Sequence, residues 1–148
     1  MSLINVNSET LKINESGSVT GNIFFESSGF NFPEMLWFDF PVRLIGWWID
    51  QFLCALKENS SEFEFWFMEG AFKVSFKAAG IHQYVVKFID RGKIEKILFE
   101  DKVCIEEIKT ALIDCGQAIL VKLEEKDISC DDKNILESKL RELSNQSL

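Results

Sequence analysis

A chain of 148 residues has the length of one domain, and a composition of 47% hydrophobic and 27% charged residues is that of a globular protein. These proportions exclude a wholly disordered, collagen-like or low-complexity protein. Sixteen basic and twenty-four acidic side chains give a net charge of −8, so neither nucleic acid nor a membrane is an expected partner. The acidity lies in residues 1–40 and 103–148, each with a net charge of −4.

The first third of the chain predicts a hairpin followed by a helix. The apolar residues in 4–13 and 18–27 predict two strands, and a cluster of turn-forming residues lies between them. Residues 41–57 place their apolar side chains on one broad face, which is typical of an amphipathic helix. Pro41 falls in the first turn, where its missing N–H costs nothing, and Asp39 is the expected N-cap.

A second hairpin is specified down to its register. Glu69-Gly70 can form a two-residue type I′ turn, because glycine tolerates a positive φ. In that register the two residues of each cross-strand pair lie on the same face of the hairpin. The phenylalanines lie on one face and the charged residues on the other. The charged face predicts a cation–π contact between Trp66 and Lys73 and a charge pair between Glu62 and Lys77.

The remaining residues predict two strands and two helices. Strands are expected at 81–89 and 93–100, and a long helix at 101–126, in which Gly116 is a modest weakness. A capping box opens a last helix, 131–144, which we expect to pack loosely. We therefore expect a single α+β domain over residues 1–148, in the order β-β-α-β-β-β-β-α-α. Because short turns make the strands antiparallel, we expect an antiparallel sheet with the helices packed on one face.

Few residues of this sequence form a pattern typical of catalysis or of metal or cofactor binding. The sequence contains none of the common nucleotide, metal or hydrolase motifs, one histidine, and four cysteines at spacings that match neither a zinc site nor a disulfide framework. We expect no catalytic residue, no metal and no cofactor. With no secretory signal or membrane span expected either, the interpretation is a cytoplasmic protein with reduced thiols. An enzyme remains an alternative, through Glu62 and Glu64 on one strand face or through a cysteine near His82.

Two tryptophans are candidates for a partner surface. Fourteen Phe and one Tyr indicate that aromatic side chains mainly fill the core, so most of those between Phe30 and Trp48 are expected there. Trp47 falls off the apolar centre of its helix, and Trp66 falls on the charged face of its hairpin. Tryptophan and arginine are the typical anchors of protein interfaces. The predicted partner-binding residues are Arg43, Trp47, Asp50, Glu62, Glu64 and Trp66. The alternative is that another helix or the 4–27 hairpin covers each of the two tryptophans.

Three runs carry a family resemblance: Trp37-Phe38-Asp39-Phe40-Pro41-Val42, Gly46-Trp47-Trp48-Ile49 and the segment 65–72. Over residues 33–77, about a third of the chain, they resemble small acidic bacterial proteins of the immunity type, which neutralise a toxin. The resemblance implies a non-enzymatic protein-binding module. Since many toxin domains act on nucleic acid and are basic, an acidic inhibitor would associate quickly with them. The alternative is a homodimer or larger homo-oligomer with a structural or regulatory role.

Overall fold

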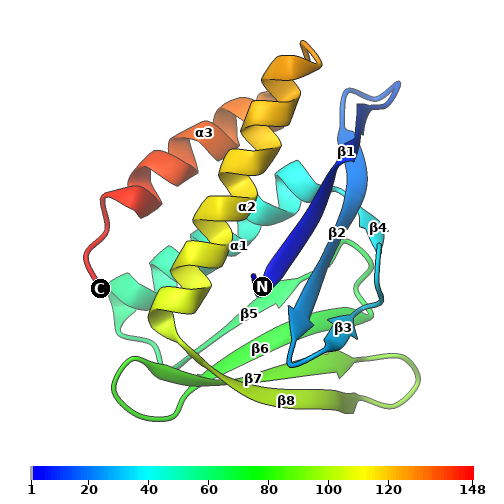
Figure 1. Cartoon of the computed structure of the whole chain (residues 1–148). Coiled ribbons are helices and arrows are strands. Elements are labelled where there is room, and N and C mark those ends of the chain that lie inside the picture. Colours follow the sequence, from blue (N-terminus) through cyan, green and yellow to red (C-terminus); the bar gives the residue numbers. More distant parts are fainter. Residues whose placement is uncertain (1) are drawn as a thin grey trace.

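Two antiparallel sheets and three helices make up residues 2–148, the part of the chain that this computed structural model describes (Figure 1). The first sheet contains β1 (Ile4–Ile13), β2 (Val19–Ser27), β3 (Phe30–Phe32) and β4 (Phe38–Asp39). The second contains β5 (Glu62–Trp66), β6 (Phe72–Ala78), β7 (Gln83–Asp90) and β8 (Lys96–Cys104). The helices are α1 (Pro41–Glu58), α2 (Ile105–Glu125) and α3 (Asp131–Ser144). The α+β class and the order of the long elements are confirmed.

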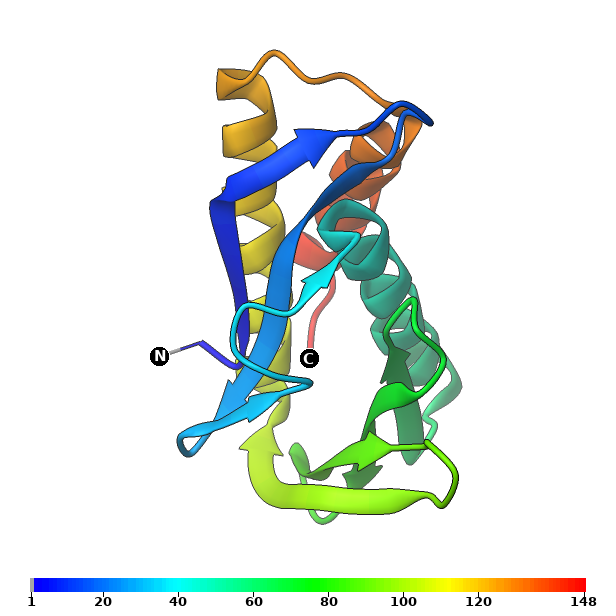
Figure 2. The same ribbon diagram turned by 90° about the vertical axis from the view of Figure 1, so that its right-hand side faces the viewer.

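The first sheet is built around β2. Strand β1 pairs with it as predicted, with a bulge between Asn7 and Lys12. The segment between β2 and α1, in which no strand was predicted, adds two short strands, because β3 and β4 both pair with β2. From α2, the Lys126 ammonium donates to the carbonyl oxygens of Glu9 (2.9 Å) and Leu11 (2.6 Å) in the bulge. The bulged part of β1 is thereby fixed to the end of α2, and the two lie side by side (Figure 2).

The second sheet is a meander in which β5 and β6 have the predicted register. The pairs run from Glu62 opposite Lys77 to Trp66 opposite Lys73. The predicted type I′ turn is wrong, since Gly70 has no positive φ and the Phe72 amide donates to the Glu69 carbonyl oxygen at 3.2 Å. Met68 takes no part in the strand pairing of this hairpin, and its backbone faces the Asp39 carboxyl of β4.

Helices α1 and α3 begin at the predicted residues, 41 and 131, but without the predicted caps, and α2 begins later than predicted. The N-cap of α1 is Phe40 and not Asp39. The Asp39 carboxylate instead accepts hydrogen bonds from the Phe40 amide at 2.8 Å and from the Trp37 indole N–H at 2.9 Å. Helix α2 begins at Ile105, because β8 continues to pair with β7 as far as Cys104. The capping box predicted for α3 is not formed, and its N-cap Cys130 makes no side-chain capping bond.

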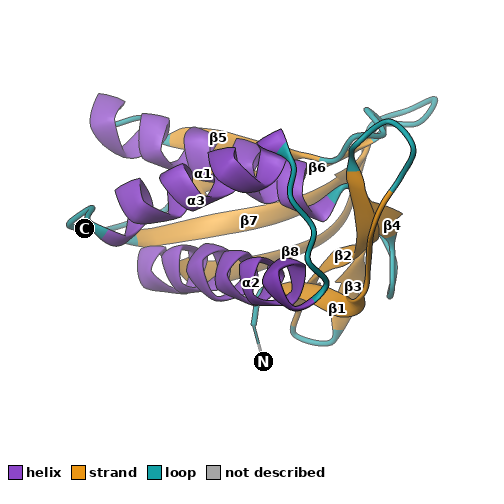
Figure 3. Cartoon of the chain, turned by 90° about the horizontal axis from the view of Figure 1, so that it is seen from above, coloured by secondary structure: helices purple, strands orange, loops and turns teal. Residues whose placement is uncertain are grey.

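Aromatic rings join the two sheets into one core, where the sequence suggested a single sheet. Phe25 of β2 lies 5.2 Å from Trp48 of α1, ring centre to ring centre, and 5.9 Å from Phe88 of β7. Trp48 in turn stacks on Phe65 of β5 at 5.5 Å. Helix α1 thus sits at the junction of both sheets, and α3 lies between α1 and α2 when the helices are seen from above (Figure 3).

Helix α3 is anchored by leucines. Leu136 and Leu143 are fully buried and Leu140 is nearly so. Leu140 lies against Gly116 of α2, where a Cβ built on the glycine would come within 2.8 Å of both terminal carbons of the leucine. The absence of a side chain at Gly116 therefore sets how closely α3 approaches α2.

Candidate functional site

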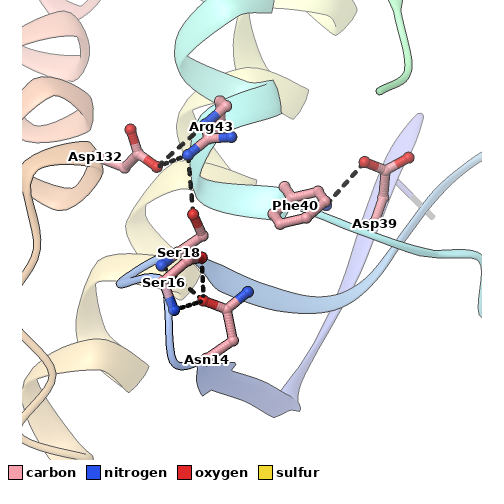
Figure 4. Close-up of polar contacts among 7 residues, drawn as sticks. All are labelled: Asn14, Ser16, Ser18, Asp39, Phe40, Arg43 and Asp132. Atoms are coloured by element: carbon pink, nitrogen blue, oxygen red, sulfur yellow. Dashed lines mark hydrogen bonds and ion pairs between the residues drawn. The ribbon is translucent and has the colours of Figure 1, made fainter. Parts of the chain in front are cut away.

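Helices α1 and α3 run in the same direction and meet along a line that we call the α1–α3 seam. Three ion pairs cross it: Arg43 with Asp132 (3.1 Å), Asp50 with Lys139, and Lys57 with Glu142 (3.9 Å). The Arg43 guanidinium also donates to the Ser18 hydroxyl at 3.0 Å, so it ties the first hairpin to both helices (Figure 4). The Asp50 carboxylate raises the pKa of Lys139 through their hydrogen bond. Two of the predicted partner-binding residues are thus engaged within the molecule.

Trp47 lies in the same seam between the first two ion pairs, and 45% of its surface is exposed. On α3, the exposed Ile135 falls between the two residues that make those ion pairs, Asp132 and Lys139. The other three tryptophans each donate their indole N–H to the protein: Trp37 to Asp39, Trp48 to the Trp66 carbonyl oxygen and Trp66 to Glu64. Within residues 2–148 the indole N–H of Trp47 has no such acceptor.

Trp66 lies on the outer face of the second sheet and is half-buried by charged side chains. The Lys73 ammonium lies 5.1 Å and the Arg91 guanidinium 5.0 Å from its ring, which confirms the predicted contact with Lys73. Glu64 accepts the indole N–H at 3.2 Å and pairs with Lys73 at 2.9 Å. Glu95 pairs with both cations. The ring is therefore covered by charged side chains from β5, β6 and the β7–β8 turn, whereas the alternative for this tryptophan expected another helix or the 4–27 hairpin.

A hollow of about 530 Å³ borders this cluster, over the small side chain of Ser75. Its rim includes Glu62 and Glu64, the carboxylates considered for acid–base chemistry. Each has a lysine partner, since Glu62 pairs with Lys77 at 3.7 Å and Glu64 with Lys73. This arrangement is typical of a solvated strand face. In the described part of the chain, no group of three or more His, Cys, Asp or Glu side chains is placed to hold a metal ion.

A cluster of exposed apolar side chains, which we call the apolar knob, stands where β3 leads into β4. It consists of Met35, Leu36 and Phe38, which are 53% to 62% exposed and nearly consecutive in the chain. Exposed apolar side chains gathered in this way mark interaction sites more often than isolated ones do.

The backbone beneath the apolar knob is fixed at several points. The Trp37 amide donates to the Glu34 carbonyl oxygen at 3.2 Å, and the Asn22 side chain donates to the Leu36 carbonyl oxygen at 2.8 Å. The Trp37 ring packs edge-on against Phe72 at 5.2 Å, below the surface. Leu36 itself has a φ of 60°, in the left-handed region that leucine rarely adopts.

Sequence reasoning missed the apolar knob because it assigned the aromatic side chains of this stretch to the core. Phe38 is 58% exposed, whereas its neighbour Asp39 is buried. This is the alternation of a strand, and β4 was not predicted. Burial raises the pKa of Asp39, although three hydrogen bonds, from the Trp37 indole, the Phe40 backbone and the Met68 backbone, oppose the shift.

A third apolar area is the groove between α2 and α3, with a volume of about 670 Å³. Leu120, Val121 and Leu140 line it, together with polar and charged side chains that include Glu137 and Arg141. Both charge signs are present along its rim. Its exposed Val121 is a useful control position, because it lies on α2, outside both the α1–α3 seam and the apolar knob.

No protein-family model, curated protein or solved structure matches this chain. None of the helices in residues 2–148 is long and apolar enough to cross a membrane.

Proposed function

We propose that this chain is a non-enzymatic protein-binding module of the toxin-neutralising type, which acts in the cytoplasm on a basic protein. The observation that carries the proposal is Trp47, a large and partly exposed side chain beside two ion pairs, whose indole N–H has no acceptor within residues 2–148. Interface anchors have this character, since a partner gains from covering the ring and from accepting its N–H.

The exposed part of Trp47 is large enough to matter for affinity. A tryptophan buries about 150–250 Å² in a core or an interface. With 45% of its surface exposed, a partner could remove about 70–110 Å² from water, which is about 2–3 kcal/mol. That energy corresponds to roughly 30- to 150-fold in Kd. The ion pairs on either side support the proposal, because charged side chains around an anchor help to exclude water from it.

The net charge of −8 supports a basic partner. Opposite net charges steer two proteins together and accelerate their encounter, and salt screens this effect. Binding should therefore weaken as the salt concentration rises, mainly through a slower association rate.

The test is capture of partners from a lysate of the source cells by the immobilised chain, at low and at high salt. Trp47→Ala is compared with Val121→Ala, a matched loss of an exposed apolar side chain on α2. We expect one basic protein to bind the original chain and the Val121 variant, and to bind the Trp47 variant at least tenfold more weakly. Equal binding by both variants would contradict the role of Trp47. A chain that elutes only as its own dimer would favour the homo-oligomeric alternative.

A further inference from the structure

We infer that residues 91–98, which we call the basic tip, bind to the surface of a membrane that contains anionic lipid. The basic tip consists of the turn between β7 and β8 and the first residues of β8, and all of its residues are exposed. It lies at the lower right in Figure 1, away from α3. The inference goes beyond the proposed function, because it concerns a different surface and a partner that is not a protein.

Three large apolar side chains of the basic tip are in contact with water. Ile94 is 73% exposed, and Ile97 and Leu98 are exposed as well. Successive residues of a regular strand point to opposite faces, but a bulge in β8 leaves Leu98 without a partner in β7, so both neighbours reach the surface. Apolar side chains gathered on one short segment can enter the boundary between lipid headgroups and acyl chains, where they leave water.

Two lysines flank the most exposed of these isoleucines. Lys93 and Lys96 are both exposed, and neither forms an ion pair within residues 2–148. The one carboxylate of the basic tip, Glu95, is already paired with Arg91 at 3.4 Å and with Lys73 at 3.8 Å. The unpaired charges of the basic tip are therefore positive, and they would attract anionic headgroups.

The net charge of −8 is distributed unevenly over the molecule. Residues 72–104, from β6 to β8, carry seven basic and four acidic side chains, whereas the rest of the chain carries nine basic and twenty acidic ones. One of the four, Asp101, faces the first sheet, where two serine hydroxyls donate to it. Another, Asp90, lies opposite Lys96 and reduces the local excess of positive charge without cancelling it. Because charges at physiological ionic strength interact over about 8 Å, a membrane would respond to this local excess and not to the net charge.

Anionic lipid fits both features of the basic tip better than other acidic partners do. A nucleic acid would be attracted by the lysines, but its bases stack on aromatic rings, and residues 91–98 contain none. A stable protein interface takes about 20–30 residues on each side. The basic tip is much shorter, and next to it the outer face of the second sheet carries the charged pairs around Trp66. Peripheral membrane binding needs only a short segment that combines aliphatic side chains with cations.

The chain offers a matched control at Ile81, in the turn between β6 and β7 at the opposite end of the same sheet. Ile81 is 89% exposed, and its neighbours on both sides are neither lysine nor arginine. The test is co-sedimentation of the full chain with vesicles of phosphatidylcholine alone, or of phosphatidylcholine and phosphatidylglycerol in equal parts. We expect binding to the mixed vesicles only, and we expect salt to weaken it.

Variants then separate the two features of the basic tip. Ile94→Ser should lower the partition coefficient at least about fivefold, and Lys93→Gln combined with Lys96→Gln roughly 20-fold, since each lysine near an anionic surface contributes about fivefold. Ile81→Ser should leave it unchanged. No binding to the mixed vesicles, equal binding to both kinds of vesicle, or an equal loss in Ile81→Ser and Ile94→Ser would each overturn the inference. If the chain binds single-stranded DNA more tightly than the mixed vesicles, the lysines serve a nucleic acid and the inference is wrong as well.

Discussion

Two helical glycines provide a sensitive test of how α3 is packed. Gly46 lies in α1 and Gly116 in α2, and replacing either with alanine should gain about 1 kcal/mol from helix propensity alone. Their surroundings differ. A Cβ at Gly46 would meet no atom within 4 Å, whereas a Cβ at Gly116 would come within 2.8 Å of two Leu140 carbons and within 3.2 Å of a third.

The two substitutions should therefore have opposite effects on stability. Gly46→Ala should raise the free energy of unfolding by about 1 kcal/mol, because nothing opposes the propensity gain. Gly116→Ala should lower it by up to about 2 kcal/mol, because overpacking costs about 1–3 kcal/mol and propensity offsets about 1 kcal/mol of that. The expected difference between the two variants is about 1–3 kcal/mol.

Urea unfolding of both variants, followed by far-ultraviolet circular dichroism, measures this difference. Leu140→Ala is then combined with Gly116→Ala, and the double variant should be more stable than the sum of the single effects by about 1–3 kcal/mol. Equal stabilisation by both glycine substitutions would refute the reasoning, because it would mean that α3 does not press on α2 at this point. The same result would support the loosely packed last helix that the sequence suggested.

Two further predictions concern titratable groups. The hydroxyls of Ser27 and Ser28 donate to the Asp101 carboxylate and hold its pKa below the usual value. This contact therefore stabilises the fold fully at a pH above the ordinary aspartate pKa. The stabilisation is lost as the pH falls through the lowered pKa of the folded state. Asp101→Asn should reduce the loss of unfolding free energy measured below about pH 4. Glu58 raises the pKa of the exposed Cys54 thiol, so alkylation of Cys54 followed by mass spectrometry should be slow and should accelerate in Glu58→Gln.

The register of the second hairpin could be predicted because the residues that determine it are close together in the sequence. Alternating phenylalanines admit one register, and a shift by one residue would expose every ring to water. The start of α2 was predicted too early for the opposite reason. The helix was predicted to open at residue 101 or 102, but pairing with β7, which lies earlier in the chain, keeps residues 101–104 in a strand. The division into two sheets likewise depends on contacts between Phe25 and rings of the second sheet, which are distant in sequence.

The candidate surfaces were predictable only in part. The helical wheel correctly separated exposed Trp47 from buried Trp48. It could not show that Arg43 and Asp50 pair with α3, because helical periodicity does not say which charged side chain a neighbouring helix presents. The exposure of Phe38 depends on β4, a strand of two residues that pairs with β2, and so short a strand has no periodic signal.

The clasp between β1 and the end of α2 has a consequence for the order in which the chain folds. The Lys126 ammonium and the Leu11 carbonyl oxygen that it binds are 115 residues apart. At about 5–20 residues per second, a ribosome needs roughly 6–23 seconds to add that length of chain. The first strand to be synthesised therefore waits with its bulge unfixed while the second sheet, whose strands are neighbours in sequence, is made and paired. A nascent chain that stalls before α2 is complete would leave the part of β1 that packs against α2 exposed to water, so chaperones would have to shield this part of the strand during synthesis.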